Sequence, residues 1–126
     1  MKKTTIISLI LLVLISILIV PKELQNDTFY LIKVGESIVN NGLDFIDHFS
    51  IHNLNYLYPH LLFSLITYFS YNILSYKGLY ILTIIFTIIL SFTLFFVNCK
   101  NSKNKIISLA ISILTIVFLS DFITLR

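Results

Sequence analysis

Charged residues, cysteine and tryptophan are scarce in this sequence. Its 126 residues include one cysteine (Cys99), no tryptophan and six acidic side chains, and 12% of them are charged. A typical soluble domain is about 25% charged, so a soluble fold of this length could not cover its own surface. The single cysteine excludes a disulfide scaffold, and the 57% apolar content excludes a disordered chain.

The basic residues outnumber the acidic ones by nine to six, but they do not predict a face for nucleic acid. They are scattered along the chain, and three lie in one short loop, at Lys100, Lys103 and Lys105. A nucleic-acid-binding protein gathers its lysine and arginine side chains on one surface. The composition therefore predicts an integral membrane protein whose partner is the lipid bilayer, with no nucleic acid partner.

Three apolar runs without charge predict membrane-crossing helices, at 4–20, 79–97 and 106–120. The first covers roughly 26 Å at 1.5 Å per residue, close to the thickness of the hydrocarbon core. Lys2 and Lys3 precede it, which predicts an uncleaved signal anchor with its N-terminus in the cytoplasm. A cleaved signal peptide is the alternative, although the end of the run offers no small-residue cleavage site.

A further helix is predicted at 57–76, and its two faces differ. Apolar side chains fill one broad face. The polar side chains on the other face are His60, Ser64, Thr67, Tyr68, Tyr71, Asn72 and Ser75. The preferred interpretation is a helix that lies along the membrane surface or is steeply tilted; the alternative is a helix whose polar side faces protein or water within a bundle. If it crossed the membrane, the loop with three lysines would lie outside, against the positive-inside tendency, so three crossings are favoured over four.

Residues 21–56 form a polar segment that is expected outside the membrane. It holds five of the six acidic residues, which is the main functional signal of the sequence. An amphipathic helix is predicted at 28–40, with Asp27 as its N-cap. Its apolar side is predicted to hold Leu31, Ile32, Val34, Gly35, Ile38 and Val39. The whole chain, residues 1–126, is thus expected to be one all-α integral membrane domain, with amphipathic interfacial helices in its first extracytoplasmic loop.

A second group of titratable residues follows this helix, at Asp44, Asp47, His48 and His52. On a helix the two histidines, spaced i and i+4, would share a metal with a carboxylate. The run around them is typical of turn and loop, however, so a solvated loop is expected and no metal site is predicted. The sequence contains no nucleotide loop, nucleophile elbow or zinc signature, so no cofactor is expected either.

Several short motifs follow the signal anchor, and their order along the chain is informative. They are Asp27 with Gly35 eight residues on, Asn41-Gly42, Asp47-x-Phe49-Ser50, Tyr58-Pro59-His60-Leu61, Gly78-Leu79 and Leu125-Arg126. This order resembles the amino-terminal part of the bacterial membrane glycosyltransferases of the GT-C superfamily, which includes protein mannosyltransferases, aminoarabinose transferases and oligosaccharyltransferases. The chain departs from that pattern because it lacks the usual tryptophan and is several times shorter than family members.

The resemblance implies a reaction at the outer face of the bacterial cell membrane, in which a sugar leaves a polyprenyl-phosphate donor. It assigns Asp27 and Asp47 as catalytic carboxylates, since a carboxylate near the interface can take a proton from an acceptor hydroxyl. His60, Lys33 and Arg126 are further expected to bind substrate, and a cation at Lys33 or Arg126 would pair with the lipid phosphate. The expected protein is multi-pass, with a cytoplasmic N-terminus.

The shortness of the chain leaves its status as an enzyme open. It is expected to be an amino-terminal fragment of a larger enzyme and inactive alone, because one loop cannot hold a transition state without its supporting shell. The alternative is a small, non-catalytic, multi-span membrane protein that acts through helix–helix association with a membrane protein partner.

Overall fold

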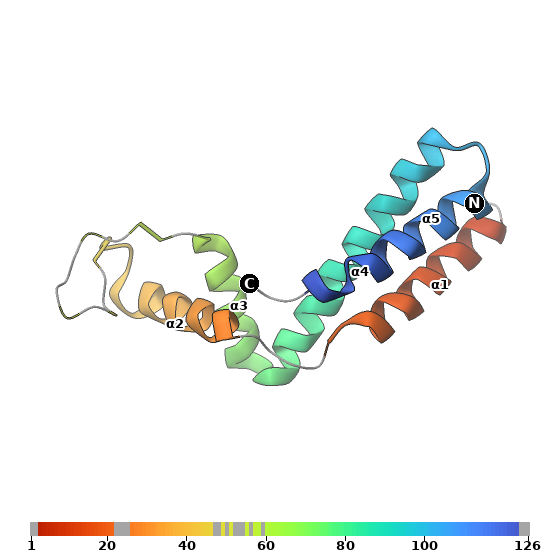
Figure 1. Cartoon of the computed structure of the whole chain (residues 1–126). Helices are drawn as coiled ribbons and strands as arrows, with labels where there is room; N and C mark the ends of the chain where they lie inside the picture. The colour runs from red at the N-terminus through yellow and green to blue at the C-terminus, as the bar shows by residue number, and fades with distance from the viewer. Residues whose placement is uncertain are drawn as a thin grey trace. The chain divides into compact units, whose positions relative to one another are not determined.

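The computed structural model describes residues 3–21, 26–46, 49, 51, 55, 57–58 and 60–123. Its described residues form the helices α1 (Lys3–Ile19), α2 (Asn26–Asn41), α3 (Leu61–Leu74), α4 (Tyr76–Asn101) and α5 (Lys105–Phe118). A 3₁₀ turn, η1 (Ser120–Phe122), follows α5 (Figure 1). Strand pairing in this part of the chain is limited to one isolated antiparallel bridge, between Ile46 and Asn55. The prediction of an all-α protein is confirmed.

Among the described helices, α4 is the one that is long and apolar enough to cross a membrane, judged on length and composition. Its 26 residues extend about 39 Å at 1.5 Å per residue, more than a hydrocarbon core requires. The other apolar helices are shorter, with 17 residues in α1, 14 in α3 and 14 in α5. The helix lengths therefore do not support the predicted three or four crossings.

The chain divides into two compact units, each described here by itself. One unit, the three-helix unit, contains α1, α5 and the part of α4 from Tyr80 onward. The Lys105 ammonium donates to the Thr5 hydroxyl, so α1 and α5 begin at the same end of the unit. Only residues 102–104 separate α4 from α5, so α4 runs antiparallel to α5 and to α1 (Figure 1). The unit is therefore an up–down–up bundle.

Contacts between the helices hold this bundle together along its length. Leu12 of α1, Phe95 of α4 and Ile116 of α5 are fully buried in one cluster. The hydroxyl oxygens of Ser16 and Ser91 lie 2.8 Å apart between α1 and α4. The Asn98 side-chain amide of α4 donates to the Ser112 hydroxyl of α5 at 2.9 Å.

The three-helix unit buries many hydroxyl residues beside its apolar cluster and exposes large apolar side chains. Hydroxyl residues occupy much of its buried surface, at Thr5, Ser8, Ser16, Thr83, Thr87, Ser91, Ser108 and Ser112. Large aliphatic side chains of the same helices are exposed, with Leu14 at 57%, Ile89 at 54% and Leu114 at 57%. Soluble bundles turn their apolar face inward, whereas membrane helices pack through small and hydroxyl residues.

The second unit is built on the packing of α2 against α3, which meet at Gly35. A Cβ at position 35 would lie 2.4 Å from the Ser64 carbonyl oxygen and 2.6 Å from Tyr68 Cβ, so only glycine permits this approach. Ser64 and Thr67 of α3 are fully buried. Part of the polar face predicted for 57–76 is thus covered by protein, whereas His60, Asn72 and Ser75 of the same face are exposed.

Backbone conformation sets the limits of α3. His60 before it and Ser75 after it have positive φ values of 61° and 53°, which L-residues with a side chain rarely adopt and which interrupt a right-handed helix. The helix is therefore shorter than the predicted 57–76. Gly78 permits the sharp turn into α4, because a Cβ there would lie 2.0 Å from the Ser70 carbonyl oxygen.

Candidate functional site

An open cleft of about 320 Å³ lies between α2 and α3. It reaches the lower end of the range for small-molecule sites, which is about 300–1,000 Å³. Its lining residues are Phe29, Ile32, Lys33 and Glu36 from α2 and Tyr68, Tyr71 and Asn72 from α3. The lining positions on each helix are three or four residues apart, so they share one face of that helix.

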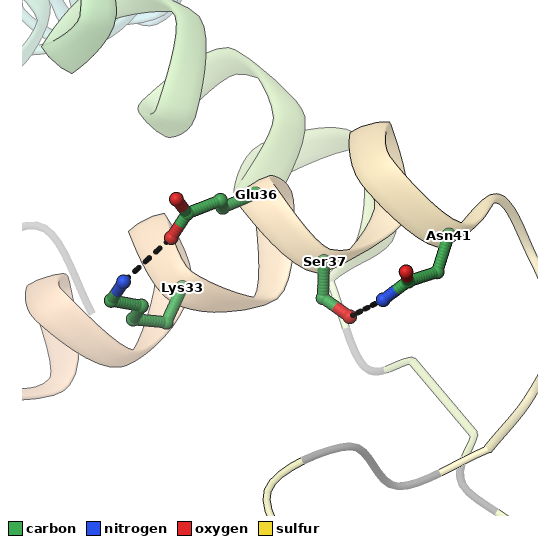
Figure 2. Close-up of polar contacts among 4 residues, drawn as sticks. All are labelled: Lys33, Glu36, Ser37 and Asn41. Atoms are coloured by element: carbon green, nitrogen blue, oxygen red, sulfur yellow. Dashed lines mark hydrogen bonds and ion pairs between the residues drawn. The ribbon is translucent and has the colours of Figure 1, made fainter.

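The charged part of the cleft is an ion pair on α2. The Lys33 ammonium donates to the Glu36 carboxylate at 2.6 Å across one turn of the helix (Figure 2). This hydrogen bond, together with the charge of Glu36, raises the pKa of Lys33 above its ordinary value. Lys33 is exposed and Glu36 is half-buried. The pair is therefore open to solvent, and a ligand can compete for either partner.

The aromatic part of the cleft comes mainly from α3. The Tyr71 ring meets the Tyr76 ring edge to face, with centroids 5.6 Å apart, and Phe29 of α2 packs edge to face on Tyr76 at 6.3 Å. The electrostatic effect of Tyr76, followed by its hydrogen bond to Tyr71, raises the pKa of Tyr71 above its ordinary value. These ring contacts connect α2, α3 and the first turn of α4.

The side chains of the cleft offer one cation, one carboxylate, hydrogen-bonding groups and aromatic surface. The Lys33 ammonium can pair with a phosphate, as lysine does in many phosphate sites. The Glu36 carboxylate and the Asn72 amide can hydrogen-bond hydroxyl groups. The tyrosine rings offer flat apolar surface against which a ring or a lipid chain can pack.

Asp27, the first predicted catalytic residue, is exposed and lies outside the cleft lining. Helix α2 begins at Asn26, so Asp27 lies in the first turn and not at the predicted N-cap position. A carboxylate in this turn still interacts favourably with the helix dipole. At 100° per residue Asp27 points about 160° away from Phe29 and the cleft face of α2. The structure therefore brings Lys33, but not Asp27, into the cleft.

The other predicted site residues are not gathered at the cleft either. His60 is exposed and immediately precedes α3, and its side chain makes no capping hydrogen bond. Asp47 and Arg126 lie outside the described residues, as do His48 and His52 of the weighed metal cluster. In the part of the chain that is described, no group of three metal-ligating side chains occurs.

The described portion of the loop between α2 and α3 is organised by Asp44. Its carboxylate accepts hydrogen bonds from the Tyr58 hydroxyl at 3.0 Å and from the Ile46 amide at 3.2 Å. The Phe45 and Tyr58 rings lie 6.1 Å apart beside it. Asp44 therefore has a structural role in closing this loop.

Sequence reasoning missed every lining residue of the cleft except Lys33, including the four with polar groups, which are Glu36, Tyr68, Tyr71 and Asn72. Their signal was present, because positions 68, 71 and 72 form a polar patch on one face of an apolar helix. The patch can be recognised as one wall of a cleft only when the packing of α2 beside it is known. The sequence alone gives no register between the two helices.

Comparisons with protein-family models, with curated proteins and with solved structures found no match to this chain. Its function is therefore inferred from its own residues and their geometry.

Proposed function

We propose that the chain is a multi-pass protein of the bacterial cell membrane, in which α1, α4 and α5 cross the bilayer. The observation that supports this most strongly is the extensive exposure of large aliphatic side chains on the three-helix unit, together with the hydroxyl residues buried between its helices. In water such an apolar surface would cause the chains to aggregate, whereas in a bilayer it would contact the lipid chains. Helices α1 and α5 are short for a span, and local bilayer thinning or snorkelling of flanking lysines accommodates such helices.

The bundle also has one basic end, which supports a cytoplasmic N-terminus. Lys3 begins α1, and Lys100, Lys103 and Lys105 lie where α4 ends and α5 begins. Because α1 and α5 are parallel, these lysines belong to the same end of the bundle. Basic residues near membrane spans favour the cytoplasmic side. The α2–α3 unit, between the first and second crossings, would then lie outside.

Cysteine labelling in intact bacteria tests this topology. In a Cys99→Ser background, a cysteine at position 103 should react with a membrane-impermeant maleimide only after the cells are permeabilised. A cysteine at the exposed position 40 on α2 should react without permeabilisation and serves as the matched control. Labelling of position 103 from outside would contradict three crossings and support a fourth, by residues 57–76.

We further propose that the α2–α3 cleft binds a polyprenyl-phosphate-linked sugar, as part of a glycosyltransferase of the GT-C type. Lys33 would bind the phosphate, and Glu36 and Asn72 would hydrogen-bond the sugar. Asp27 points away from the cleft across the width of α2, so it would act as a base only for an acceptor hydroxyl bound outside this cleft. The support for this proposal is the juxtaposition of a cation, a carboxylate and aromatic rings in one cleft.

Opposite effects of two charge changes test binding in the cleft. Lys33→Gln should weaken binding of farnesyl phosphate, a soluble polyprenyl phosphate, about fivefold, because an exposed charge-assisted contact is lost. Glu36→Gln should strengthen it, since Lys33 is released from its ion pair. Equilibrium binding to the full chain in a neutral detergent measures both effects, with Lys77→Gln as the charge-matched control. Equal effects of Lys33→Gln and Lys77→Gln would contradict a specific phosphate site.

The second candidate function is helix–helix association without catalysis. The observation that favours it is the small, hydroxyl-rich packing surface repeated on α1, α4 and α5, the type of surface through which membrane helices associate. If farnesyl phosphate does not bind the cleft while the topology above holds, this candidate is the better one.

A further inference from the structure

We propose that the basic end of the three-helix bundle binds the headgroups of anionic phospholipids of the cytoplasmic leaflet. The proposal rests on the membrane-crossing arrangement proposed above. It concerns the ends of α1, α4 and α5 and is independent of the α2–α3 cleft.

Specific contacts bring the three helix ends together. The Lys105 ammonium donates to the Thr5 hydroxyl, which joins the first turn of α5 to the first turn of α1. The connection from α4 to α5 is short and internally bonded. The Asn104 amide donates to the Ser102 hydroxyl at 3.2 Å, and the Asn104 side chain accepts from the Ile106 amide at 3.0 Å. The lysines of this region therefore extend from an ordered framework.

The charge at this end has a single sign. The described residues at this end include four lysines, of which Lys3, Lys100 and Lys103 are exposed. The acidic side chain among the described residues of the bundle is Asp121, which lies in η1, beyond the opposite end of α5. No described residue at the basic end offsets the lysines, so a bound anion finds no repelling carboxylate.

The helix termini add to this positive field. Two helices, α1 and α5, begin at the basic end, and each presents the positive end of its dipole there. The first turn of α1 contains no acidic residue. One helix, α4, ends there, and Lys100 in its last turn offsets its negative dipole end. Together, the lysines and the helix dipoles make the potential at this end positive, which favours an anion with several oxygen acceptors.

The position of the site identifies the anion as a lipid headgroup. The lysines lie just beyond the apolar segments of three helices, at the level where phosphodiester groups of a bilayer are found. Basic pockets between membrane helices on the cytoplasmic side bind anionic headgroups, and each lysine near the surface contributes enough to change affinity about fivefold.

Binding of fluorescent short-chain phosphatidylglycerol to the full chain in dodecyl maltoside tests the proposal. The chain should bind this lipid in clear preference to the matching phosphatidylcholine. The double variant Lys100→Gln/Lys103→Gln should weaken phosphatidylglycerol binding on the order of twentyfold, and Lys77→Gln should leave it unchanged. Both lysines are exposed, and a circular dichroism spectrum checks that the helices of the variant are intact.

Three outcomes would overturn the proposal: equal binding of the two lipids, unchanged binding in the double variant, or displacement of the lipid by inorganic phosphate at equal concentration. The last result would mean that free phosphate is the ligand. The binding is measured in detergent and does not depend on orientation. Labelling of position 103 from outside the cell would instead contradict the proposed topology, so the two failures are distinguishable.

Discussion

Replacing Ile89 by lysine is expected to make membrane insertion of the chain less favourable by about 3 kcal/mol, because a charge would lie at the centre of a helix surrounded by lipid. Ile89 lies midway along α4 and is 54% exposed on the outer surface of the bundle. In water the same substitution at an exposed position would change stability by less than about 0.5 kcal/mol. A loss of about 3 kcal/mol would therefore indicate that lipid surrounds α4, whereas a change below about 0.5 kcal/mol would indicate water.

Glycosylation mapping of the full chain in microsomes measures the inserted fraction of α4. Because a strongly apolar helix inserts almost completely, the double variant Ile85→Lys/Ile89→Lys brings the equilibrium into the measurable range. Leu57→Lys, at an exposed loop position, is the matched control and should leave insertion unchanged. Full insertion of the double variant, or a soluble and monomeric chain, would contradict the membrane assignment.

Gly35→Ala is expected to destabilise the α2–α3 unit by about 2 kcal/mol, and Gly35→Leu by about 3 kcal/mol or more. The new Cβ would meet the Ser64 carbonyl oxygen and Tyr68 Cβ, and a backbone atom of α3 cannot turn aside as a flexible side chain would. Alanine in place of glycine gains about 0.5–1 kcal/mol of helix propensity, so the expected loss is what remains after that gain.

Hydrogen exchange of the α2 and α3 amides measures this effect as a lower free energy of local opening. Asn40→Ala, an exposed substitution on the same helix, is the control and should leave exchange unchanged or slow it. Faster exchange in α4 and α5 alone would show that the two helices do not meet at Gly35. The cleft should bind farnesyl phosphate more weakly in Gly35→Ala, because its two walls are displaced.

The existence of the helices could be predicted from the sequence, but their ends could not. Helix α4 extends from Tyr76 to Asn101, whereas the predicted span was 79–97, because a helix continues through polar flanks that an apolar run excludes. Helix α3 is shorter than predicted, since left-handed residues at both ends are a backbone property without a clear sequence signal.

The buried face of α2 was predicted in part. Leu31, Ile32, Val34, Gly35 and Ile38 are buried as the helical periodicity indicated. Val39, however, is exposed at 46%, whereas Ser37 is buried, because small residues suit a close helix crossing better than their polarity suggests. For the candidate site, Lys33 could be identified from its charge, but its companions from α3 could not, since their pairing depends on tertiary register.

The hydroxyls inside the three-helix unit have a consequence for how the bundle assembles. The hydroxyls that can donate to the carbonyl four residues earlier in the chain are those of Ser8, Ser16, Thr87, Ser91, Ser108 and Ser112. A helix with such internal bonds enters lipid without an unsatisfied hydroxyl, so insertion does not require its neighbours. Since a hydroxyl has one proton, Ser16 and Ser91 must release one carbonyl to bond each other. When the helices assemble, a hydrogen bond within one helix is replaced by one between two helices, so the number of hydrogen bonds hardly changes. The stability of the bundle then depends mainly on close packing between the helices.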